Sequence, residues 1–344
     1  MDLKKIFIKN ASPVKTGGQA VLEGVMMKSE DRVSLAVRLP DDTMHIKTQA
    51  TGKRGRWTRM PVIRGVIVFV DSLVQGTKTL MDSADILERY EGEGQLEEDR
   101  FSLWLKKIFG EKGAWNVMLY TSVILALAFT IGVFVIGPTA AVSWAHRFTD
   151  SDILLNLIEG IFRILLFVLY IVLISKMEDI KKVFQYHGAE HKSIHCMENG
   201  EELTVGNCRK YCTIHPRCGT SFLMFVMVTA LILFSFLGWP DLLWRILSRL
   251  LLIPVIAGIS FELLRWAGRS ESWVVKILSI PGLYLQKLTT REPEDDQMEV
   301  AIAALKAATS DIPEFGEGMC DKEGRIIKDL PEKENENRQE EDTI

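Results

Sequence analysis

The chain has 344 residues, of which 47% are hydrophobic and 25% charged, and its formal net charge at pH 7 is −4. This length could hold one large domain or two ordinary ones, but the apolar residues lie in long blocks instead of being spread as in a soluble core. The basic residues are scattered along the edges of these blocks, a pattern that predicts no nucleic-acid binding.

Residues 1–55 are predicted to form a small cytoplasmic segment that contains β-structure. Two alternating stretches, 33–40 and 44–50, flank a polar turn at Pro40-Asp41-Asp42, which is typical of a hairpin. Before them, the stretch 16–27 (TGGQAVLEGVMM) holds one carboxylate, Glu23, in an otherwise uncharged run. No Gly-Lys-Ser/Thr follows its glycines, so a phosphate-binding loop is excluded. The glycines instead favour a tight turn or close approach to another element.

Residues 56–112 are predicted to contain an interfacial helix followed by an acidic linker. The stretch 56–87 is apolar and helix-like, but its charges leave no uncharged run long enough to cross a bilayer. Residues 91–100 (EGEGQLEEDR) are the linker.

Residues 113–268 are predicted to form a four-helix transmembrane bundle. Four blocks have the length and composition that a bilayer demands: Gly113–Ala145, Ile153–Ser175, Thr220–Leu237 and Leu242–Trp266. The second block carries Glu159 and Arg163 at helical i, i+4 spacing, which predicts an ion pair inside the bundle.

The distribution of basic residues in the loops predicts the orientation. The loop 176–219 contains seven Lys and Arg residues, whereas Arg147 is alone between the first two spans and residues 238–241 contain none. By the positive-inside rule this loop and both termini are cytoplasmic, so we expect a multi-pass protein of the cytoplasmic (inner) membrane, with the lipid bilayer as its first partner.

The remainder of the chain is predicted to be interfacial and then disordered. Residues 269–311 should hold an interfacial segment, 272–293, that is broken at Pro281-Gly282, and an amphipathic helix, 295–309. Residues 312–344 are acidic and poor in apolar residues, which predicts a disordered tail. This C-terminal region could recruit a protein partner. The fold class is therefore mainly α, with one small β element.

A cluster of potential metal ligands lies in the cytoplasmic loop 176–219. In the stretch 184–200 (FQYHGAEHKSIHCMENG), His187, Glu190 and His191 would share one face of a helix, and His195 would continue it. Two neutral imidazoles one turn apart can hold a divalent metal such as zinc, and a carboxylate between them can act as general base. The string has the H-x-x-E-H form, with Glu190 as the candidate catalytic residue. The alternatives are an ordinary polar helix whose histidines lie at the surface, or a helix whose His187 and His191 cap and hydrogen-bond a loop.

The sequence does not decide which residue is the third metal ligand. The candidate third ligands are His215, Cys218 and Glu262, and a separate Cys3His zinc site could instead use Cys208, Cys212, His215 and Cys218. For Glu262 the competing interpretation is an ion pair with Arg265. Around the ligands we expect supporting contacts from Glu23, His195, Arg217 and Glu292.

Five motifs together resemble the YqhQ-like family of bacterial membrane proteins. They are GGQAVLEGVMM (17–27), FQYHGAEHKSIH (184–195), HPRCGTSF (215–222), FELLR (261–265) and the stretch 288–305. The resemblance implies that His187, Glu190, His191, His215, Arg217, Cys218, Glu23 and residues 289–293 are family features. It does not extend to Cys208 and Cys212, so it favours a metal site on His187 and His191. The family has no assigned biochemical role, although it is sometimes labelled a predicted metal-dependent enzyme.

Three functions remain open at this point. The first is a membrane-embedded, metal-dependent hydrolase of unknown substrate that faces the cytoplasm. The second is a non-catalytic membrane scaffold or regulator whose metal or polar site is structural. The third, a transporter, is disfavoured because the chain has no internal repeat.

Overall fold

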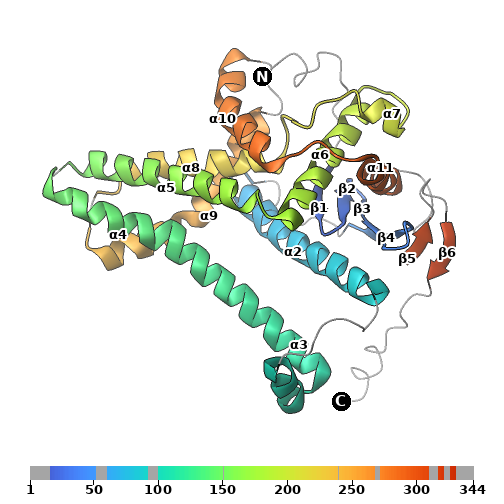
Figure 1. Cartoon of the computed structure of the whole chain (residues 1–344). Helices are drawn as coiled ribbons and strands as arrows, with labels where there is room; N and C mark the ends of the chain where they lie inside the picture. Colours follow the sequence, from blue (N-terminus) through green and yellow to red (C-terminus); the bar gives the residue numbers. More distant parts are fainter. Residues whose placement is uncertain are drawn as a thin grey trace.

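The computed structural model describes residues 16–51, 60–91, 100–149, 151–238, 240–267, 272–309, 317–320 and 326–330. Most of these residues are helical, and the strands gather in one sheet at one end of the molecule (Figure 1). The predicted acidic linker, 91–100, and the terminal tail, 331–344, lie almost wholly outside the described residues.

The sheet is antiparallel, and its strands are neighbours in the order of the sequence, from β1 to β6. The strands are β1 (Gly17–Val21), β2 (Gly24–Lys28), β3 (Arg32–Arg38), β4 (Met44–Ala50), β5 (Glu317–Cys320) and β6 (Ile326–Leu330). The predicted hairpin is confirmed, with Arg38 paired to Met44 and Arg32 to Ala50. The prediction of disorder throughout 312–344 is wrong for β5 and β6, because β5 pairs with β4 and extends the N-terminal sheet. Composition alone could not reveal this long-range pairing.

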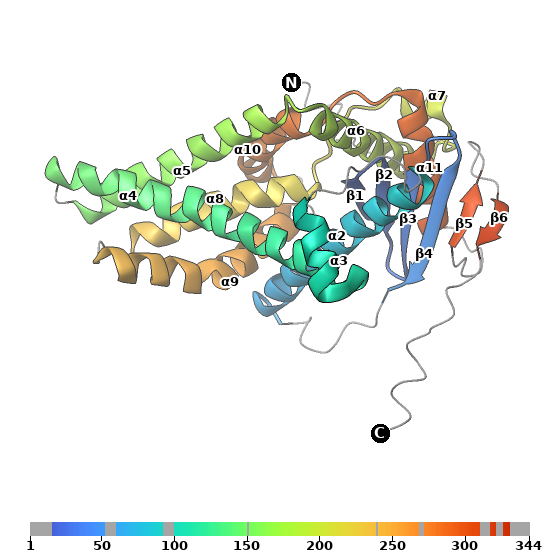
Figure 2. The same cartoon turned by 60° about the horizontal axis from the view of Figure 1, so that its bottom comes forward.

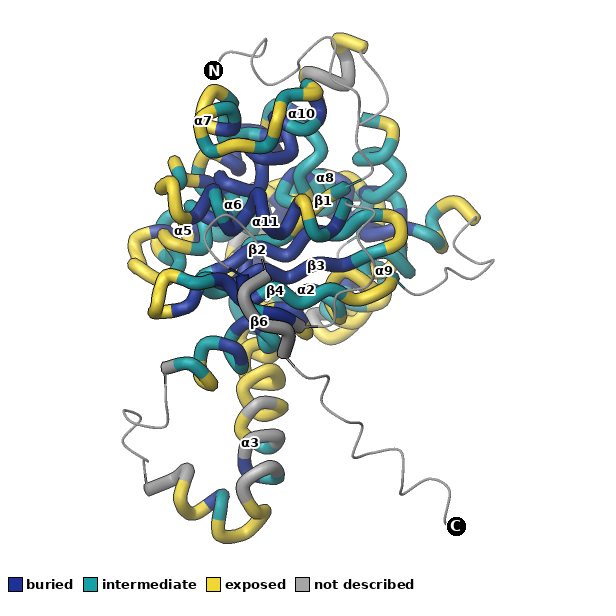
Figure 3. The backbone as a smooth tube through the Cα atoms, turned by 90° about the vertical axis from the view of Figure 1, so that its right-hand side faces the viewer, coloured by how far each residue is buried: buried dark blue, intermediate teal, exposed yellow. Residues whose placement is uncertain are grey.

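Helices cover both faces of the sheet. On one face lie α6 (Glu178–Glu198) and α11 (Asp295–Thr309), whose apolar side chains form a core with Val25, Met27 and Ala36. On the other face lies α2 (Ile63–Glu91), whose Ile86 packs with Val37 and other residues. Figure 3 shows α6, α11 and the central strands as the most buried part of the molecule. The predicted helix at 295–309 is confirmed, but its apolar residues from Met298 to Leu305 are buried, so it does not offer a free apolar face to a partner.

The apolar helices extend away from the sheet. They are α3 (Arg100–Ile131), which continues through a π-helical turn (Gly132–Ile136) into α4 (Gly137–Ser143), then α5 (Asp152–Ile174), α8 (Gly219–Ser235) and α9 (Leu242–Ala267). Figures 1 and 2 show α4, α5, α8 and α9 pointing together to the end opposite the sheet. Short helical turns, Trp144–Arg147 and α7 (Val205–Cys208), lie in the connections.

Three helical segments within the described residues are long and apolar enough to cross a membrane: Tyr120–Ser143, Asp152–Ile174 and Leu243–Ala267. They match three of the four predicted spans. The remaining predicted span, Thr220–Leu237, corresponds to α8, which is apolar but has 17 residues, or about 25 Å at 1.5 Å per residue. This is shorter than the roughly 30 Å hydrocarbon core of a bilayer, so the predicted count of four spans is not confirmed.

A buried polar cluster joins the apolar helices. The Arg163 guanidinium contacts the Glu159 carboxylate at 2.6 Å, which confirms the predicted i, i+4 pair. Arg249 of α9 pairs with the same carboxylate, and the Thr139 hydroxyl donates to it at 2.9 Å.

One further helix differs from its predicted form. Residues Trp273–Thr289 form a single helix, α10, with Pro281 inside it, so the predicted break at Pro281-Gly282 is wrong. At Gly282 an added Cβ would lie 2.9 Å from the Ser221 hydroxyl oxygen of α8. Glycine therefore allows α10 to pack closely on α8, and this packing holds the helix together across the proline.

Candidate metal centre

Helix α6 presents the predicted H-x-x-E-H string. Its first turn carries Glu178 and Asp179, which interact favourably with the positive end of the helix dipole. From Tyr186 to Cys196 almost every residue is buried, because the helix lies between the sheet, α11 and the loop that leads to α8. The interpretation as surface histidines is wrong for His191 and His195, which are buried, and His187 is half-buried. Hydrogen bonding to a loop is confirmed for His191, whose Nδ1 bonds the Thr213 carbonyl.

The imidazoles of His187 and His191 are oriented by backbone carbonyl groups. Nδ1 of His187 donates to the Thr289 carbonyl at 2.8 Å, and Nδ1 of His191 donates to the Thr213 carbonyl at 2.6 Å. A carbonyl oxygen only accepts, so the neutral form of each ring carries its proton on Nδ1 and its lone pair on Nε2. Metal-binding histidines are commonly fixed in this way.

Cys218 lies opposite the two imidazoles, at the N-terminus of α8. Its Sγ is 3.2 Å from Nε2 of His187, and the ligand atoms of His187, His191 and Cys218 all lie within 4.8 Å of one another. Burial alone would raise the pKa of the Cys218 thiol, but His191 and the hydrogen bonds from Thr220 more than offset burial and lower it. The His191 side chain also interacts with the Cys218 thiol, and this contact helps to lower the pKa of the thiol. Two nitrogens and a sulfur in this arrangement match the donor preference of zinc.

Glu190 lies between the two histidines in sequence and beside them in space. Burial raises the pKa of its carboxyl from 4.5 to about 7, although His187 and a hydrogen bond from the Gly18 backbone amide oppose that rise. An added Cβ at Gly18 would lie 2.9 Å from Cγ and Cδ of Glu190. The glycine predicted to allow close approach does so here, since it brings the edge of the sheet against this carboxylate.

A second group of ligand-type side chains lies farther along α6. It contains His195, Glu198 and His215, all buried, with ligand atoms within 4.8 Å of one another. Nε2 of His215 donates to Glu198 at 3.3 Å, and Arg217 pairs with the same carboxylate. Burial lowers the pKa of His215 to about 4, so this ring is neutral near pH 7.

The two groups together form a continuous row of imidazoles. Ring centroids are 4.4 Å apart from His187 to His191, 5.7 Å from His191 to His215, and 4.5 Å from His215 to His195. Of the predicted third ligands, the structure thus brings Cys218 to His187 and His191, and places His215 in the second group. Arg217 and His195 support that second group.

Three predicted carboxylates have other partners. Glu262 forms an ion pair with Arg64 of α2 and also accepts from the Val62 amide at 3.3 Å. Glu23 stands in the β1–β2 turn with φ +47°, pairs with Lys182 at 2.6 Å and accepts from the Tyr186 hydroxyl at 3.4 Å. Glu292 pairs with the buried Lys192. Glu23 and Glu292 therefore hold α6 in place from two sides, whereas Glu262 ties α9 to α2.

The alternative Cys3His site is not assembled. Cys208 is buried beside Cys196, and burial raises the pKa of its thiol to about 12. Neither Cys208 nor Cys212 belongs to a metal-capable group in the described part of the chain.

Sequence reasoning missed two features of the site. Glu198 lies three residues after His195, on the same helical face, so spacing alone could have suggested it. Gln286 clamps the loop: its amide oxygen accepts from the His215 backbone N–H and its amide nitrogen donates to the His215 carbonyl, each at 2.9 Å. Nothing in the sequence signals that second contact, because it joins residues far apart in the chain.

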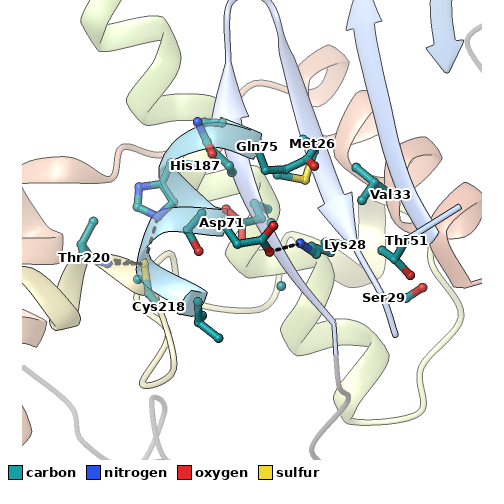
Figure 4. Close-up of a pocket in the computed structure, with 18 of the residues that line it drawn as sticks. Met26, Lys28, Ser29, Val33, Thr51, Asp71, Gln75, His187, Cys218 and Thr220 are labelled. Atoms are coloured by element: carbon teal, nitrogen blue, oxygen red, sulfur yellow. Dashed lines mark hydrogen bonds and ion pairs between the residues drawn. The ribbon is translucent and has the colours of Figure 1, made fainter. Parts of the chain in front are cut away.

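A cavity of about 1380 Å³ leads to the candidate metal centre. His187, Glu190 and Cys218 line one end, and the edge of the sheet, α2 and the end of α5 line the remainder. In Figure 4, His187, Cys218 and Thr220 lie at one side of this cavity, and Ser29 and Thr51 lie at the other.

Comparison with known proteins places the chain in a family. Residues 60–311 match the model described as "Protein of unknown function (DUF1385)". The chain belongs to this family. It is also 34% identical over 305 residues to "Uncharacterized protein YqhQ" of Bacillus subtilis (strain 168), an alignment that covers 86% of this chain and 93% of that protein. No solved structure matches. The resemblance noted from the motifs is thereby confirmed, and it assigns no activity.

Proposed function

We propose that this chain is a metal-dependent hydrolase of the membrane surface, with zinc or a similar ion held by His187, His191 and Cys218. The observation that carries the proposal is the convergence of two Nε2 lone pairs and one low-pKa thiol on one point, beside a buried carboxylate. A catalytic zinc site keeps three protein ligands and one open position. The cavity at His187 and Cys218 provides room for that position.

The chemistry follows from the surroundings of the site. A divalent metal there would supply Lewis-acid polarisation of a carbonyl group and of water. Glu190, with a pKa of about 7, can take a proton from water at neutral pH and give it to a leaving group. The carbonyls of Thr213 and Thr289 keep both imidazoles in the tautomer that offers Nε2.

The location of the site supports action at a membrane. Ile171 and Ile174, at the C-terminal end of the spanning helix α5, line the same cavity as His187. The excess of Lys and Arg in the loop 176–219 favours the cytoplasmic side of the inner membrane for this cavity.

Metal analysis of the full chain, purified in detergent, tests the proposal. Asparagine can keep a donor near the position of Nδ1 while it removes Nε2, so His187→Asn and His191→Asn delete a ligand with little other change. We expect about one equivalent of metal in the wild type and a loss of more than tenfold in metal affinity in both variants. Glu190→Gln should retain the metal and lose hydrolysis by 100-fold or more.

A matched control is His45→Asn, which removes a buried histidine of β4 that lies outside both metal-capable groups. This variant should keep the metal content of the wild type. Wild-type protein that binds no divalent ion when zinc is supplied would refute the metal centre. Glu190→Gln protein with full function in cells would instead support the non-catalytic scaffold.

A second candidate function is supported by one contact. Cys218 caps the N-terminus of α8 and lies 3.2 Å from Nε2 of His187, which resembles a thiol nucleophile with its base. A thiol nucleophile needs one imidazole as its base, whereas two imidazoles approach Cys218, so we favour the metal. Activity that survives exhaustive chelation but is lost in Cys218→Ser would reverse this preference.

A further inference from the structure

The first strand of the sheet, β1, is an edge strand whose free side borders the candidate metal centre. Within the described ranges it pairs with β2 alone, through a two-residue turn in which Val21 opposes Gly24. Hydrogen-bonded pairs alternate along an antiparallel ladder and begin at such a turn, so the amides of Gly18 and Ala20 point outward. The amide of Gly18 does so, because it bonds Glu190 on α6.

Apart from the Gly18 amide, which bonds Glu190, the outward groups of β1 have no backbone partner along the cavity in the described part of the chain. Within the described residues, no backbone hydrogen bond outside the regular helices and strands uses Ala20 or the Gly18 carbonyl. Residues 17–20 all line the cavity that ends at His187, Glu190 and Cys218. An exposed row of strand amides and carbonyls is a template for another extended chain.

The charge of the cavity favours one class of ligand. Among the described residues that line it are the acids Glu30, Asp31, Asp71 and Glu190 and one base, Lys28, which is paired with Asp71 at 3.1 Å. Such a lining repels phosphate and other anionic headgroups and attracts cationic segments. Cytoplasmic segments that flank the spans of membrane proteins are rich in Lys and Arg, and the cavity lies at the end of a span.

We propose that the substrate of this site is an extended, Lys- or Arg-containing segment of a membrane protein, which pairs with β1 as an added strand and is cleaved beside Glu190. This inference rests on the proposed function and specifies its substrate class. Water adds to the carbonyl carbon and the C–N bond breaks. Glu190 takes one proton from the water and passes it to the leaving nitrogen, so the products are a carboxylate and an amine.

Binding of synthetic peptides to the full-length Glu190→Gln protein, which holds the metal but does not cleave, tests the proposal. The probe is a fluorescein-labelled dodecapeptide of alternating valine and lysine, measured by fluorescence anisotropy in detergent. Two matched probes carry N-methyl groups on alternate amides, one on the odd and one on the even positions. A strand added to β1 uses the amides of only one parity, so one methylated probe should bind as the parent does and the other about tenfold more weakly or worse.

A further probe replaces every lysine with glutamate and should bind at least tenfold more weakly at low salt. Equal binding of both methylated probes, equal binding of the glutamate probe, or no binding of the parent would each overturn the proposal. The failure of the metal-dependent function gives a different result. In that case the wild type holds no metal and leaves the lysine peptide intact, while parity-dependent binding persists. If the wild type hydrolyses a simple ester but the peptides show no parity-dependent binding, the metal-dependent function stands and the proposed substrate class is refuted.

Discussion

Replacement of Gly18 by alanine tests whether the edge strand and the catalytic carboxylate are in contact. The new Cβ would lie 2.7 Å from the Met26 carbonyl oxygen and 2.9 Å from Cγ and Cδ of Glu190. Comfortable contacts between carbon atoms are about 3.5–4.0 Å, so β1 and Glu190 must separate by more than half an ångström. Overpacking of this kind costs about 1–3 kcal/mol, while alanine recovers roughly 0.4–1 kcal/mol from the unfolded chain. We expect a net loss of about 1–2 kcal/mol.

Thermal unfolding in detergent measures this loss, and Gly17→Ala is the matched control. An added Cβ at Gly17 meets nothing within 4 Å, so this variant should be neutral or slightly more stable. At roughly 2–4 °C per kcal/mol, Gly18→Ala should unfold several degrees below Gly17→Ala. Its hydrolytic rate should fall by about 100-fold, since a shift of about 1 Å in a catalytic group has that effect. Identical behaviour of the two alanine variants would show that β1 does not pack on Glu190.

Three further predictions concern the carboxylate on α9, the buried imidazoles and the cysteines. Glu262→Gln breaks the ion pair with Arg64 and should lower the melting temperature slightly without changing metal content, whereas metal loss would make Glu262 a ligand. Burial lowers the pKa of His191, His195 and His215 from 6.5 to about 4, 3 and 4, respectively. Below pH 6.5 the unfolded chain therefore binds more protons than the folded protein, and stability must decrease as the pH is lowered. The raised pKa of Glu190 has the opposite effect on stability between pH 4.5 and 7, but it is one group against three. Metal-free protein should therefore melt at a lower temperature at pH 5 than at pH 7. An unchanged melting temperature would contradict these pKa shifts. Iodoacetamide should modify Cys218 before Cys208 in metal-free protein, because the pKa of the Cys218 thiol is lowered and that of the Cys208 thiol is raised to about 12. Zinc should protect Cys218. Peptide mapping by mass spectrometry measures the order of modification, and the reverse order would contradict the prediction.

The row of imidazoles explains why ligand spacing alone left the site incomplete. Along α6, positions 187, 190, 191, 195 and 198 fall on one side of the helix, so the sequence contains most of both groups in a single stretch. Which histidine joins which group depends on the loop 209–218, whose path is held by Gln286 of α10 and by Arg217 on Glu198. The sequence therefore predicted the ligand types, and the loop path assigned them to two sites.

The sequence by itself determined the features that depend on local periodicity. The hairpin of β3 and β4, the H-x-x-E-H face of α6 and the apolar character of the spans each arise from neighbours within one or two turns or strands. Only the tertiary structure decided that Cys218 meets His187, that Glu262 pairs with Arg64, and that β5 joins a sheet begun at residue 17. These contacts join distant segments, and their free energy comes from packing the whole molecule, so no local pattern encodes them. The same packing brings the Gly18 amide to Glu190 and makes one glycine of the first strand part of the candidate centre.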